Sequence, residues 1–499
     1  MTRKSLIVIG AGIAGLSTGC YARMNGYDVQ IFEKHDKPGG MCTSWVRKGY
    51  TFDYCIHNLI GSSATAKAHR YWAELGALSG TEVLTFGEMV QLEDQKGNRV
   101  DIVSDVDALE RRLIERAPAD ADLVREYVGV LRKLRKVEVM ALMLDMKPLD
   151  QLSLLPKLGL FKKLGSITAS QFSDKFQDEF LRRSFRYVQY GISEIPMIAH
   201  VGMFAAVLSG DGGWPQGGSL TLSRNIEKRY LELGGKIAYK SKVQKVLVEN
   251  GMATGVRLID GSEHRADVVI SAADGYSTVY TMLEGRYLND TIRSYYNEWV
   301  SKDQDFGLEV FLGVARDLEQ EPHALCILLD EPIVIEGVKV PKLDVEVLSS
   351  ATGVAPNGKG VIKVVFRSGY DYWKGLRDKG KEEYYAEKER IVEQVLRELE
   401  KRFPGLRGQV EAKDVITPVT TERYLGAYRG LQAWPSKVEM STLMKEGLST
   451  TLPGLEGFYM VGQYAQGTIG LTTVAAAGRK LVKRLCKEDG KKFQTSDAP

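Results

Sequence analysis

The feature that most constrains this chain is a glycine-rich turn near its start. Residues 6–9 (LIVI) have the composition of a buried parallel strand, and the sequence GAGIAG follows at once at residues 10–15. Small and apolar residues continue in a helix-like stretch to Gly26, and a second apolar segment, residues 27–32, ends at Glu33. The order strand, glycine turn, helix, strand, acid predicts a Rossmann-type unit that binds a dinucleotide.

Each residue of this turn has an expected role. Gly10 permits the tight turn, Gly12 lets the backbone approach a pyrophosphate, and Gly15 lets the helix pack closely on the strand. Glu33 would accept a hydrogen bond from a ribose hydroxyl, and its charge disfavours a 2′-phosphate. We expect three further residues at the same site, namely Ile13, Ala14 and Lys34.

NAD and FAD share this half-site, and three later segments favour FAD. The first is a second glycine loop directly after Glu33, which exposes backbone N–H groups to a phosphate or a flavin edge. The second is the block at residues 234–274, which reads as hairpin strands returning to a buried parallel strand. Expected cofactor contacts from these two segments are Gly39, Gly40, Met41, Cys42, Val243 and Ala272.

The third segment is a strand near the C-terminus that ends in glycine and is followed by a helix with apolar residues at helical spacing, residues 471–485. The N-terminus of this helix, with its free N–H groups and positive dipole end, suits the carbonyl edge of a reduced flavin. Gln463 is expected at the ribityl chain, with a hydrogen-bonded core amide as the alternative. The expected contacts here are Gly462, Gln463, Thr468, Ile469, Gly470, Leu471 and Thr472.

Together these blocks resemble the FAD-dependent oxidoreductases of the phytoene desaturase, carotenoid isomerase and retinol saturase group, within the amine-oxidase-like flavoproteins. The resemblance rests on VIGAGIAGL at residues 8–16, Gly39-Gly40 with GYTFD at 49–53, WPQGG at 214–218, TP at 417–418 with ERY at 422–424 and Gly430, and the segment 462–478. One stretch departs from it: residues 54–58 (YCIHN) stand where the desaturases tend to have a glycine-led, less polar sequence. The resemblance therefore fixes neither the substrate nor the direction of the reaction.

The resemblance implies an α/β fold with a discontinuous Rossmann-type FAD domain and an inserted mixed α+β substrate domain. We place the FAD domain at residues 1–80, 205–280 and 412–499, and the substrate domain at 81–204 and 281–411. Strand-like runs at 88–91, 306–314, 324–329, 343–349 and 360–367, and a charged amphipathic helix at 382–402, agree with this division.

In this class the flavin carries the difficult chemistry, and the protein orients the substrate. Tyr54 and His57 follow the second glycine loop, so either is a candidate for moving a proton, with a structural role beside the cofactor as the alternative. Trp214 and Pro215 are expected to line a substrate tunnel, with ordinary aromatic packing as the alternative. The scattered histidines and cysteines predict no metal site.

Charge, cysteine content and hydrophobic runs limit the partners and the location. A net charge of +3 gives no electrostatic case for nucleic-acid binding, and five cysteines without a C-x-x-C pair suit a reducing, cytoplasmic compartment. The sequence predicts no transmembrane helix. The leucine- and methionine-rich segment 140–164 is either a peripheral membrane contact that admits a lipid-like substrate or a helical cap on the core.

The leading hypothesis is FAD-dependent desaturation, saturation or redox-neutral isomerisation of a hydrophobic polyene or isoprenoid-like substrate. Because the chain has one complete dinucleotide fingerprint, we expect electrons to pass to or from oxygen, a quinone or a redox partner. The alternatives are a flavin amine oxidase and a non-enzymatic escort protein of the GDP-dissociation-inhibitor type, which shares the architecture without using FAD. The intact glycine turn and Glu33 argue against the escort protein.

Overall fold

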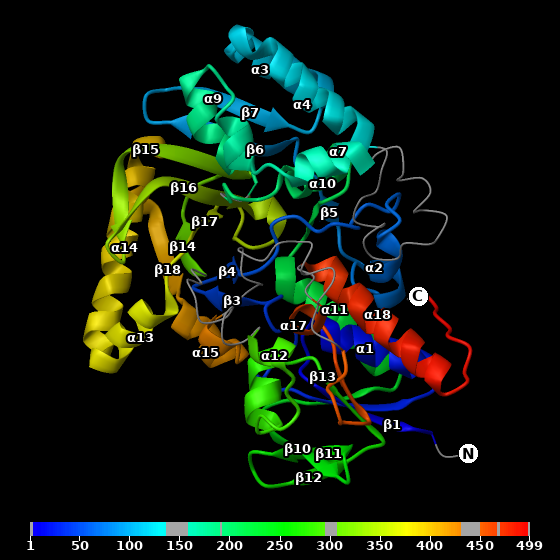
Figure 1. Cartoon of the computed structure of the whole chain (residues 1–499). Coiled ribbons are helices and arrows are strands. Elements are labelled where there is room, and N and C mark those ends of the chain that lie inside the picture. Colours follow the sequence, from blue (N-terminus) through cyan, green and yellow to red (C-terminus); the bar gives the residue numbers. More distant parts are fainter. Residues whose placement is uncertain are drawn as a thin grey trace.

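Two β-sheets organise the molecule, and a layer of helices covers each of them (Figure 1). The computed structural model describes residues 3–135, 158–189, 192–294, 307–430, 450–466 and 470–497.

The first sheet is the expected Rossmann-type sheet. Its order is β19-β13-β1-β2-β9, and all of its pairs are parallel. The dinucleotide turn therefore lies at the carboxyl edge of a central strand, which is the edge where α/β sheets bind ligands. The strands come from three separate parts of the chain: β1 (Ser5–Ile9), β2 (Asp28–Phe32), β9 (Lys236–Ala238), β13 (Val268–Ser271) and β19 (Phe458–Met460).

Three helices pack beside this sheet: α1 (Ile13–Met24), α11 (Gly218–Glu232) and α18 (Leu471–Glu488) (Figure 1). Glycines bring α1 unusually close to its neighbours. A Cβ atom on Gly478 would lie 2.6 Å from Ser17 Oγ and 2.7 Å from the Thr18 backbone nitrogen. Ser17 Oγ also donates a 2.6 Å hydrogen bond to the Ala475 carbonyl. The N-terminal and C-terminal helices are thus held together at backbone distance.

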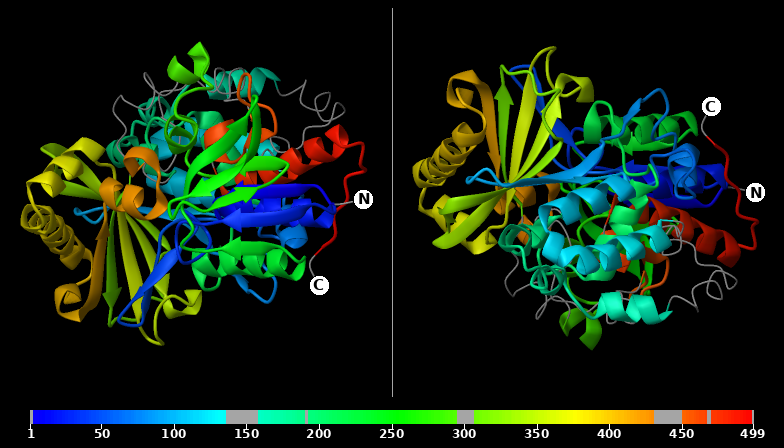
Figure 2. Two further views of the ribbon diagram at one scale, coloured as in Figure 1. Left: turned by 90° about the horizontal axis from the view of Figure 1, so that it is seen from below. Right: turned by 90° about the horizontal axis from the view of Figure 1, so that it is seen from above.

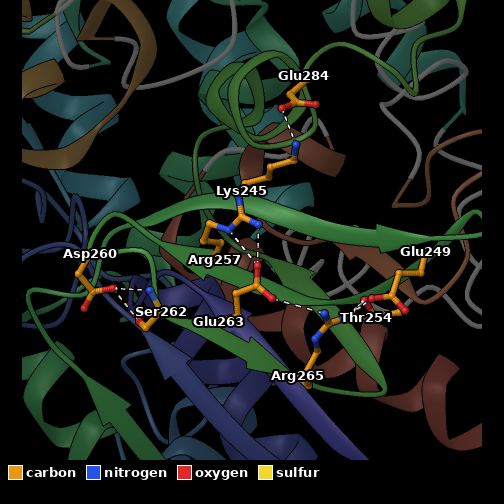
Figure 3. A network of polar contacts seen from close by, with 9 residues as sticks. All are labelled: Lys245, Glu249, Thr254, Arg257, Asp260, Ser262, Glu263, Arg265 and Glu284. Atoms are coloured by element: carbon orange, nitrogen blue, oxygen red, sulfur yellow. Dashed lines mark hydrogen bonds and ion pairs between the residues drawn. The ribbon is translucent and has the colours of Figure 1, made fainter.

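A small antiparallel sheet extends from the Rossmann part and consists of β10 (Val243–Glu249), β11 (Met252–Leu258) and β12 (Glu263–Arg265). It carries a network of surface ion pairs, in which Glu263 joins Arg257 and Arg265 (Figure 3). Because these side chains are exposed, each pair contributes little to stability, about 0–1 kcal/mol.

The second sheet is mixed and has the order β18-β14-β17-β16-β15-β6-β7. Every pair is antiparallel except β15 with β6. The expected strands and the long helix are confirmed, with these bounds: β6 (Glu88–Asp94), β7 (Arg99–Val103), β14 (Leu308–Val314), β15 (Ala324–Ile335), β16 (Val338–Ser349), β17 (Gly360–Phe366), β18 (Val410–Ile416), α13 (Tyr370–Lys379) and α14 (Lys381–Arg402).

The helices α13 and α14 cover the outer face of this sheet (Figure 2). Alternate residues of β14, such as Leu308, Val310 and Leu312, are buried with Trp373 and Ile391 in one hydrophobic cluster. The residues between them point to the opposite face, because successive side chains of a strand alternate. That opposite face is turned toward the Rossmann part of the molecule (Figure 2).

A third group of helices packs on the β6–β7 end of the second sheet (Figure 1). Its members are α3 (Val106–Arg116), α4 (Ala121–Leu134), α7 (Leu158–Gly165), α8 (Ala169–Ser173), α9 (Glu179–Ser184) and α10 (Met197–Leu208). The remaining elements are short: β3 (Ser44–Arg47), β4 (Tyr50–Asp53), β5 (Val83–Leu84), β8 (Trp214–Pro215), α2 (His69–Leu75), α12 (Asp290–Ser294), α15 (Pro418–Leu425) and α17 (Gln463–Gln466).

Two expected domain boundaries fall inside continuous elements. The boundary at residue 412 cuts β18, which pairs with β14 from Val410 onward, so the second sheet continues to Ile416. The boundary between 204 and 205 cuts α10, which packs on α4 and α7. The amino-acid composition does not change within β18 or within α10. The sequence alone therefore does not mark where the chain passes between the Rossmann part and the second sheet.

Of the leucine- and methionine-rich segment 140–164, the structure describes only residues 158–164, which lie in α7; residues 140–157 lie outside the described chain. Within the described ranges, no helix combines the length and apolar character that crossing a bilayer requires.

The close approach of α1 and α18 gives a stability prediction. Gly478→Ala should destabilise the protein by about 1–3 kcal/mol, because the new methyl group would overlap the backbone of α1. Urea unfolding followed by circular dichroism measures the change. Gly375→Ala in the exposed part of α13, where a Cβ meets nothing within 4 Å, is the matched control and should be neutral or slightly stabilising. Equal effects of the two variants would contradict this account of the helix packing.

Candidate functional site

A single cavity of about 2480 Å³ runs from the carboxyl edge of the Rossmann sheet to the inner face of the second sheet. Its wall contains the β1–α1 turn, the loop that follows β2, the start of α18, and residues of β14, β15 and β16. The β1–α1 turn and the start of α18, which are about 460 residues apart in sequence, therefore border the same space. The candidate site consists of this cavity.

The glycine turn has the geometry that the sequence predicts. Gly10 has φ +98°, a left-handed conformation that favours glycine. A Cβ on Gly15 would lie 1.9 Å from the Gly10 carbonyl oxygen, so Gly15 stands behind the turn and allows the helix to start there. A Cβ on Gly12 would meet no atom closer than 3.8 Å. The turn is thus tight on its inner side and open at Gly12, where it borders the cavity.

Glu33 lies in the cavity wall and is only 8% exposed. One of its carboxylate oxygens, Oε2, accepts a 2.7 Å hydrogen bond from the Ala11 N–H, and the other, Oε1, accepts one from the His35 N–H at 2.8 Å. The carboxylate therefore also fixes the glycine turn to the end of β2, a role that spacing alone does not reveal. Its contact with a ribose hydroxyl stays a prediction.

The second glycine loop packs directly on the first. The Gly39 N–H donates a 2.9 Å hydrogen bond to the Ala11 carbonyl. A Cβ on Gly40 would lie 3.3 Å from the Gly12 Cα atom. Gly39 itself has φ +112°, and a Cβ there would be 2.2 Å from the Cys42 carbonyl. The two loops form one surface of backbone groups beside the opening at Gly12.

The C-terminal segment completes this end of the cavity. A Cβ on Gly462 would lie 3.1 Å from the Ala14 Cβ, so the chain crosses α1 at close range. Thr472 Oγ1 donates a 2.7 Å hydrogen bond to the Ile60 carbonyl and fixes the first turn of α18 to the 54–60 loop. The first N–H groups of any helix lack partners within it, so this end presents donors near the cavity.

Most residues expected at the cofactor border this cavity. They are Gly10, Gly12, Ile13, Ala14, Glu33, Lys34, Gly39, Gly40, Met41, Cys42, Val243, Ala272, Gly462, Gln463, Gly470, Leu471 and Thr472. Thr468 and Ile469 lie outside the described residues. The open glycine backbone, the buried Glu33 carboxylate and the start of α18 together fit a dinucleotide.

Tyr54 and His57 also border the cavity, and their role in moving a proton stays a prediction. The Tyr54 hydroxyl shares a 2.7 Å hydrogen bond with Thr421 Oγ1. His57 Nδ1 contacts a carboxylate oxygen of Glu346 on β16. Burial and the Lys363 ammonium hold the pKa of His57 well below its usual value of 6.5, so the imidazole is neutral at pH 7.

Sequence reasoning missed the charged residues on the inner face of the second sheet. Lys363 on β17 is 1% exposed, and its Nζ atom lies 3.5 Å from Glu309 Oε2, 3.4 Å from Glu346 Oε2 and 3.3 Å from the Tyr54 carbonyl. Both glutamates border the cavity. The available signal was a charged residue inside an otherwise apolar strand, as in LEVFLGV and GVIKVVF. In β16 the signal was weaker, because that strand carries several charged residues.

Beyond these charges the cavity becomes apolar. We call this part the apolar arm; its wall includes Met89 and Val90 of β6 and Ile198, Ala199, Gly202 and Met203 of α10. These side chains give this part of the cavity an apolar wall.

Trp214 and Pro215 do not belong to the wall of this cavity as the structure describes it. Trp214 is fully buried, and its ring packs edge-on against His323 at 6.0 Å between centroids. His323 does border the cavity. Trp214 therefore packs behind His323, a residue of the cavity wall, and does not line the cavity itself. Pro215 of β8 pairs with Val83 of β5.

Asp274 is a further cavity residue that the sequence did not single out. It follows β13, is 8% exposed, and accepts a 2.7 Å hydrogen bond from the Ser277 N–H. Burial raises its pKa from 3.8 to about 6. Beside it, the rings of Tyr276 and Tyr428 stack with centroids 3.6 Å apart and also border the cavity.

This pKa gives a pH prediction. The pKa of Asp274 is higher in the folded state than in the unfolded state, so ionisation of this carboxyl destabilises the fold. The free energy of unfolding should therefore fall as the pH rises from about 4 and stop falling above about pH 6. A shift of about two units corresponds to about 3 kcal/mol. Asp274→Asn should therefore flatten the decline in melting temperature between pH 4.5 and pH 7 at fixed FAD concentration. Parallel pH profiles for the variant and the wild type would disprove the assignment.

Comparisons with known proteins agree with this geometry. Residues 8–75 match the NAD(P)-binding Rossmann-like domain. The chain is 26% identical to the chloroplastic prolycopene isomerase of Arabidopsis thaliana, over 97% of this chain and 83% of the relative. It is 23% identical to the all-trans-retinol 13,14-reductase of Danio rerio, over 85% and 76%, and 24% identical to the neurosporene-forming phytoene desaturase of Rhodobacter capsulatus, over 96% and 93%.

Solved structures show the same fold. An oxidoreductase from Methanosarcina mazei aligns with a TM-score of 0.60 at 19% identity, over 96% of this chain and 100% of that chain. A putrescine oxidase variant aligns with a TM-score of 0.63 at 12% identity, over 97% and 99%. The expected α/β fold and the expected resemblance are both confirmed: over most of its length the chain is similar in sequence to enzymes named prolycopene isomerase, all-trans-retinol 13,14-reductase and phytoene desaturase.

Proposed function

We propose that the protein is an FAD-dependent oxidoreductase that desaturates, saturates or isomerises carbon–carbon bonds of a hydrophobic, polyene-like substrate. The observation that carries this proposal is the continuity of one cavity from the two glycine loops to the apolar arm. A dinucleotide and a long apolar molecule could meet in such a space without crossing solvent.

The cofactor end is suited to FAD. The backbone at Gly12 and Gly40 would hold the pyrophosphate, Glu33 the ribose, and the first turn of α18 the flavin edge. When bound, FAD supplies hydride exchange at its N5 atom. Since the sequence has one complete dinucleotide fingerprint, the electrons would come from or go to an external partner such as oxygen, a quinone or a redox protein.

The substrate class follows from the apolar arm and from the relatives. The arm offers aliphatic and thioether side chains, which bind hydrocarbon by burial rather than by hydrogen bonds. The relatives are named for the isomerisation of prolycopene, the 13,14-reduction of all-trans-retinol and the desaturation of phytoene. The chain's own residues would orient the substrate and exclude water, and Tyr54 and His57 remain candidates for holding or moving a proton.

The proposal is tested by incubating the FAD-loaded protein with cis-configured and partly saturated polyenes and separating the products by chromatography. We expect a change in double-bond number or geometry, accompanied by bleaching or reoxidation of the flavin. An FAD-loaded protein that leaves every polyene unchanged but oxidises amines would replace this function by that of a flavin amine oxidase.

A variant of the glycine turn tests the cofactor pose. Gly12→Asp should abolish FAD retention while leaving the fold intact, because a Cβ fits at this position but the carboxylate would repel the pyrophosphate. Absorption at 450 nm after gel filtration measures retention, and circular dichroism measures folding. Gly375→Asp on α13 introduces the same charge at an exposed position outside the cavity wall and should retain FAD. A fully yellow Gly12→Asp protein would refute the pose.

We also propose that the 140–164 segment contacts a lipid surface from which substrate enters. Its described part, α7, carries the half-buried Leu160 and Phe161 next to the exposed Lys162, a combination suited to an anionic membrane surface; the neighbouring Lys163 pairs with Glu126. Phe161→Ser should reduce co-flotation with anionic liposomes, whereas Val46→Ser, at an exposed apolar position of β3, should not. Equal flotation of both variants would argue against this contact.

A further inference from the structure

We propose that Cys42 and Cys55 form a redox-active pair, which closes to a disulfide when a small disulfide molecule reaches it through the cavity and reopens with a small thiol. The inference goes beyond the proposed function and does not depend on it. The sequence contains no C-x-x-C pair, so this site follows from the fold and not from cysteine spacing.

The two cysteines lie at the end of a short antiparallel ladder. The strands β3 and β4 pair with each other in antiparallel register. Just beyond their ends, the Tyr54 N–H donates a 3.1 Å hydrogen bond to the Thr43 carbonyl, so the pairing continues by one residue in the same register. One further step in this register brings Cys42 to the position opposite Cys55.

This position suits a disulfide. Residues directly opposite in an antiparallel pair have Cα atoms about 4.5–5.5 Å apart, and a disulfide needs a Cα separation of about 4.4–6.8 Å. The thiols of Cys42 and Cys55 form a hydrogen bond with each other. Cys55 also packs against the hydrophobic cluster that contains Cys42. Closing a sulfur–sulfur bond therefore requires little movement of either backbone segment.

Local hydrogen bonds hold both cysteines in this arrangement. The Cys42 N–H donates to the Gly39 carbonyl at 3.0 Å, and the Cys42 thiol donates to the Ser219 carbonyl at 3.3 Å. The Cys55 N–H donates to Asp53 Oδ1 at 3.2 Å. Because both backbone segments are fixed, each thiol meets the other at a high effective concentration. This favours the bond between the two cysteines over a lasting mixed disulfide with a small molecule.

The pair is reached from the cavity. Cys42 and Cys55 both border it, and Cys55 is half-buried whereas Cys42 is 1% exposed, so a small disulfide meets Cys55 first. The hydrogen bond with Cys42, together with burial, raises the pKa of the Cys55 thiol; Asp53 acts in the same direction and Lys363 in the opposite one. Since the thiolate is the reactive form, exchange is slow at pH 7. In a reducing environment such a pair is a dithiol that oxidises transiently.

The reaction is an exchange of sulfur–sulfur bonds. The Cys55 sulfur loses its proton, attacks one sulfur of the small disulfide and releases the first small thiol. The Cys42 sulfur then attacks the Cys55 sulfur, which forms the bond between them and releases the second small thiol. Two electrons pass from the cysteine pair to the small disulfide, and the two cysteine protons end on the released thiols. The new bond joins the second glycine loop, which packs on Gly12, to the segment that follows β4.

The test treats the purified, folded protein with 2-hydroxyethyl disulfide at pH 8.5, blocks the remaining thiols and maps the cysteines by peptide mass spectrometry. Most wild-type chains should carry a bond between Cys42 and Cys55, and dithiothreitol should restore both thiols. Cys42→Ser keeps a donor for the Ser219 carbonyl and should instead carry mercaptoethanol on Cys55. Cys326→Ser is the matched control: Cys326 borders the same cavity but lies on β15, so this variant should form the same cross-link as the wild type.

A wild type in which Cys42 and Cys55 both stay free, or in which Cys55 keeps a mixed disulfide without bonding to Cys42, would overturn the proposal. A cross-link that dithiothreitol does not reverse in the folded protein would contradict a reversible site. If Cys42→Ser fails to fold, as circular dichroism would show, Cys55→Ser removes the other partner and must equally prevent the cross-link.

Discussion

The structure depends on the close approach of backbones around the first glycine turn. The first turn of α1 can lie directly behind Gly10 because Gly15 has no side chain in the way. Gly40 brings the second loop close to Gly12, and Gly478 brings α18 close to α1. Segments from the beginning and the end of the chain thereby converge on one edge of the parallel sheet. Without these contacts, the cavity would lack its cofactor end, and α18 would have no fixed starting point.

The second sheet supplies the other half of the cavity and divides its two faces by chemistry. Its outer face is apolar and is covered by α14, as strand alternation requires. Its inner face carries Lys363 between two carboxylates, which is an expensive arrangement in a buried position. A buried cluster of charges of this kind is expected where a site stabilises a charge or moves a proton beside an apolar ligand.

Local patterns predicted the Rossmann unit, the strands of the second sheet and the helix now seen as α14, because each follows from periodicity or glycine spacing within a short window. They also made His57 a candidate for moving a proton, since it follows the second glycine loop; the structure shows that His57 borders the cavity, and its role stays a prediction. They left open whether Trp214 lines a tunnel or packs in the core, which depends on a strand pairing with β5. They missed Glu346 and Lys363, whose meeting depends on the register of separate strands. Long-range pairing, not local propensity, decides those positions.

The central claim is that the glycine-lined end of the cavity holds FAD. The most direct measurement is the visible absorption spectrum of the purified protein, with chromatography of the cofactor that heating releases. The account predicts a flavin spectrum and FAD at near one equivalent per chain, either as purified or after reconstitution. A colourless protein that also fails to take up added FAD would contradict it and would favour a binding protein of the escort type.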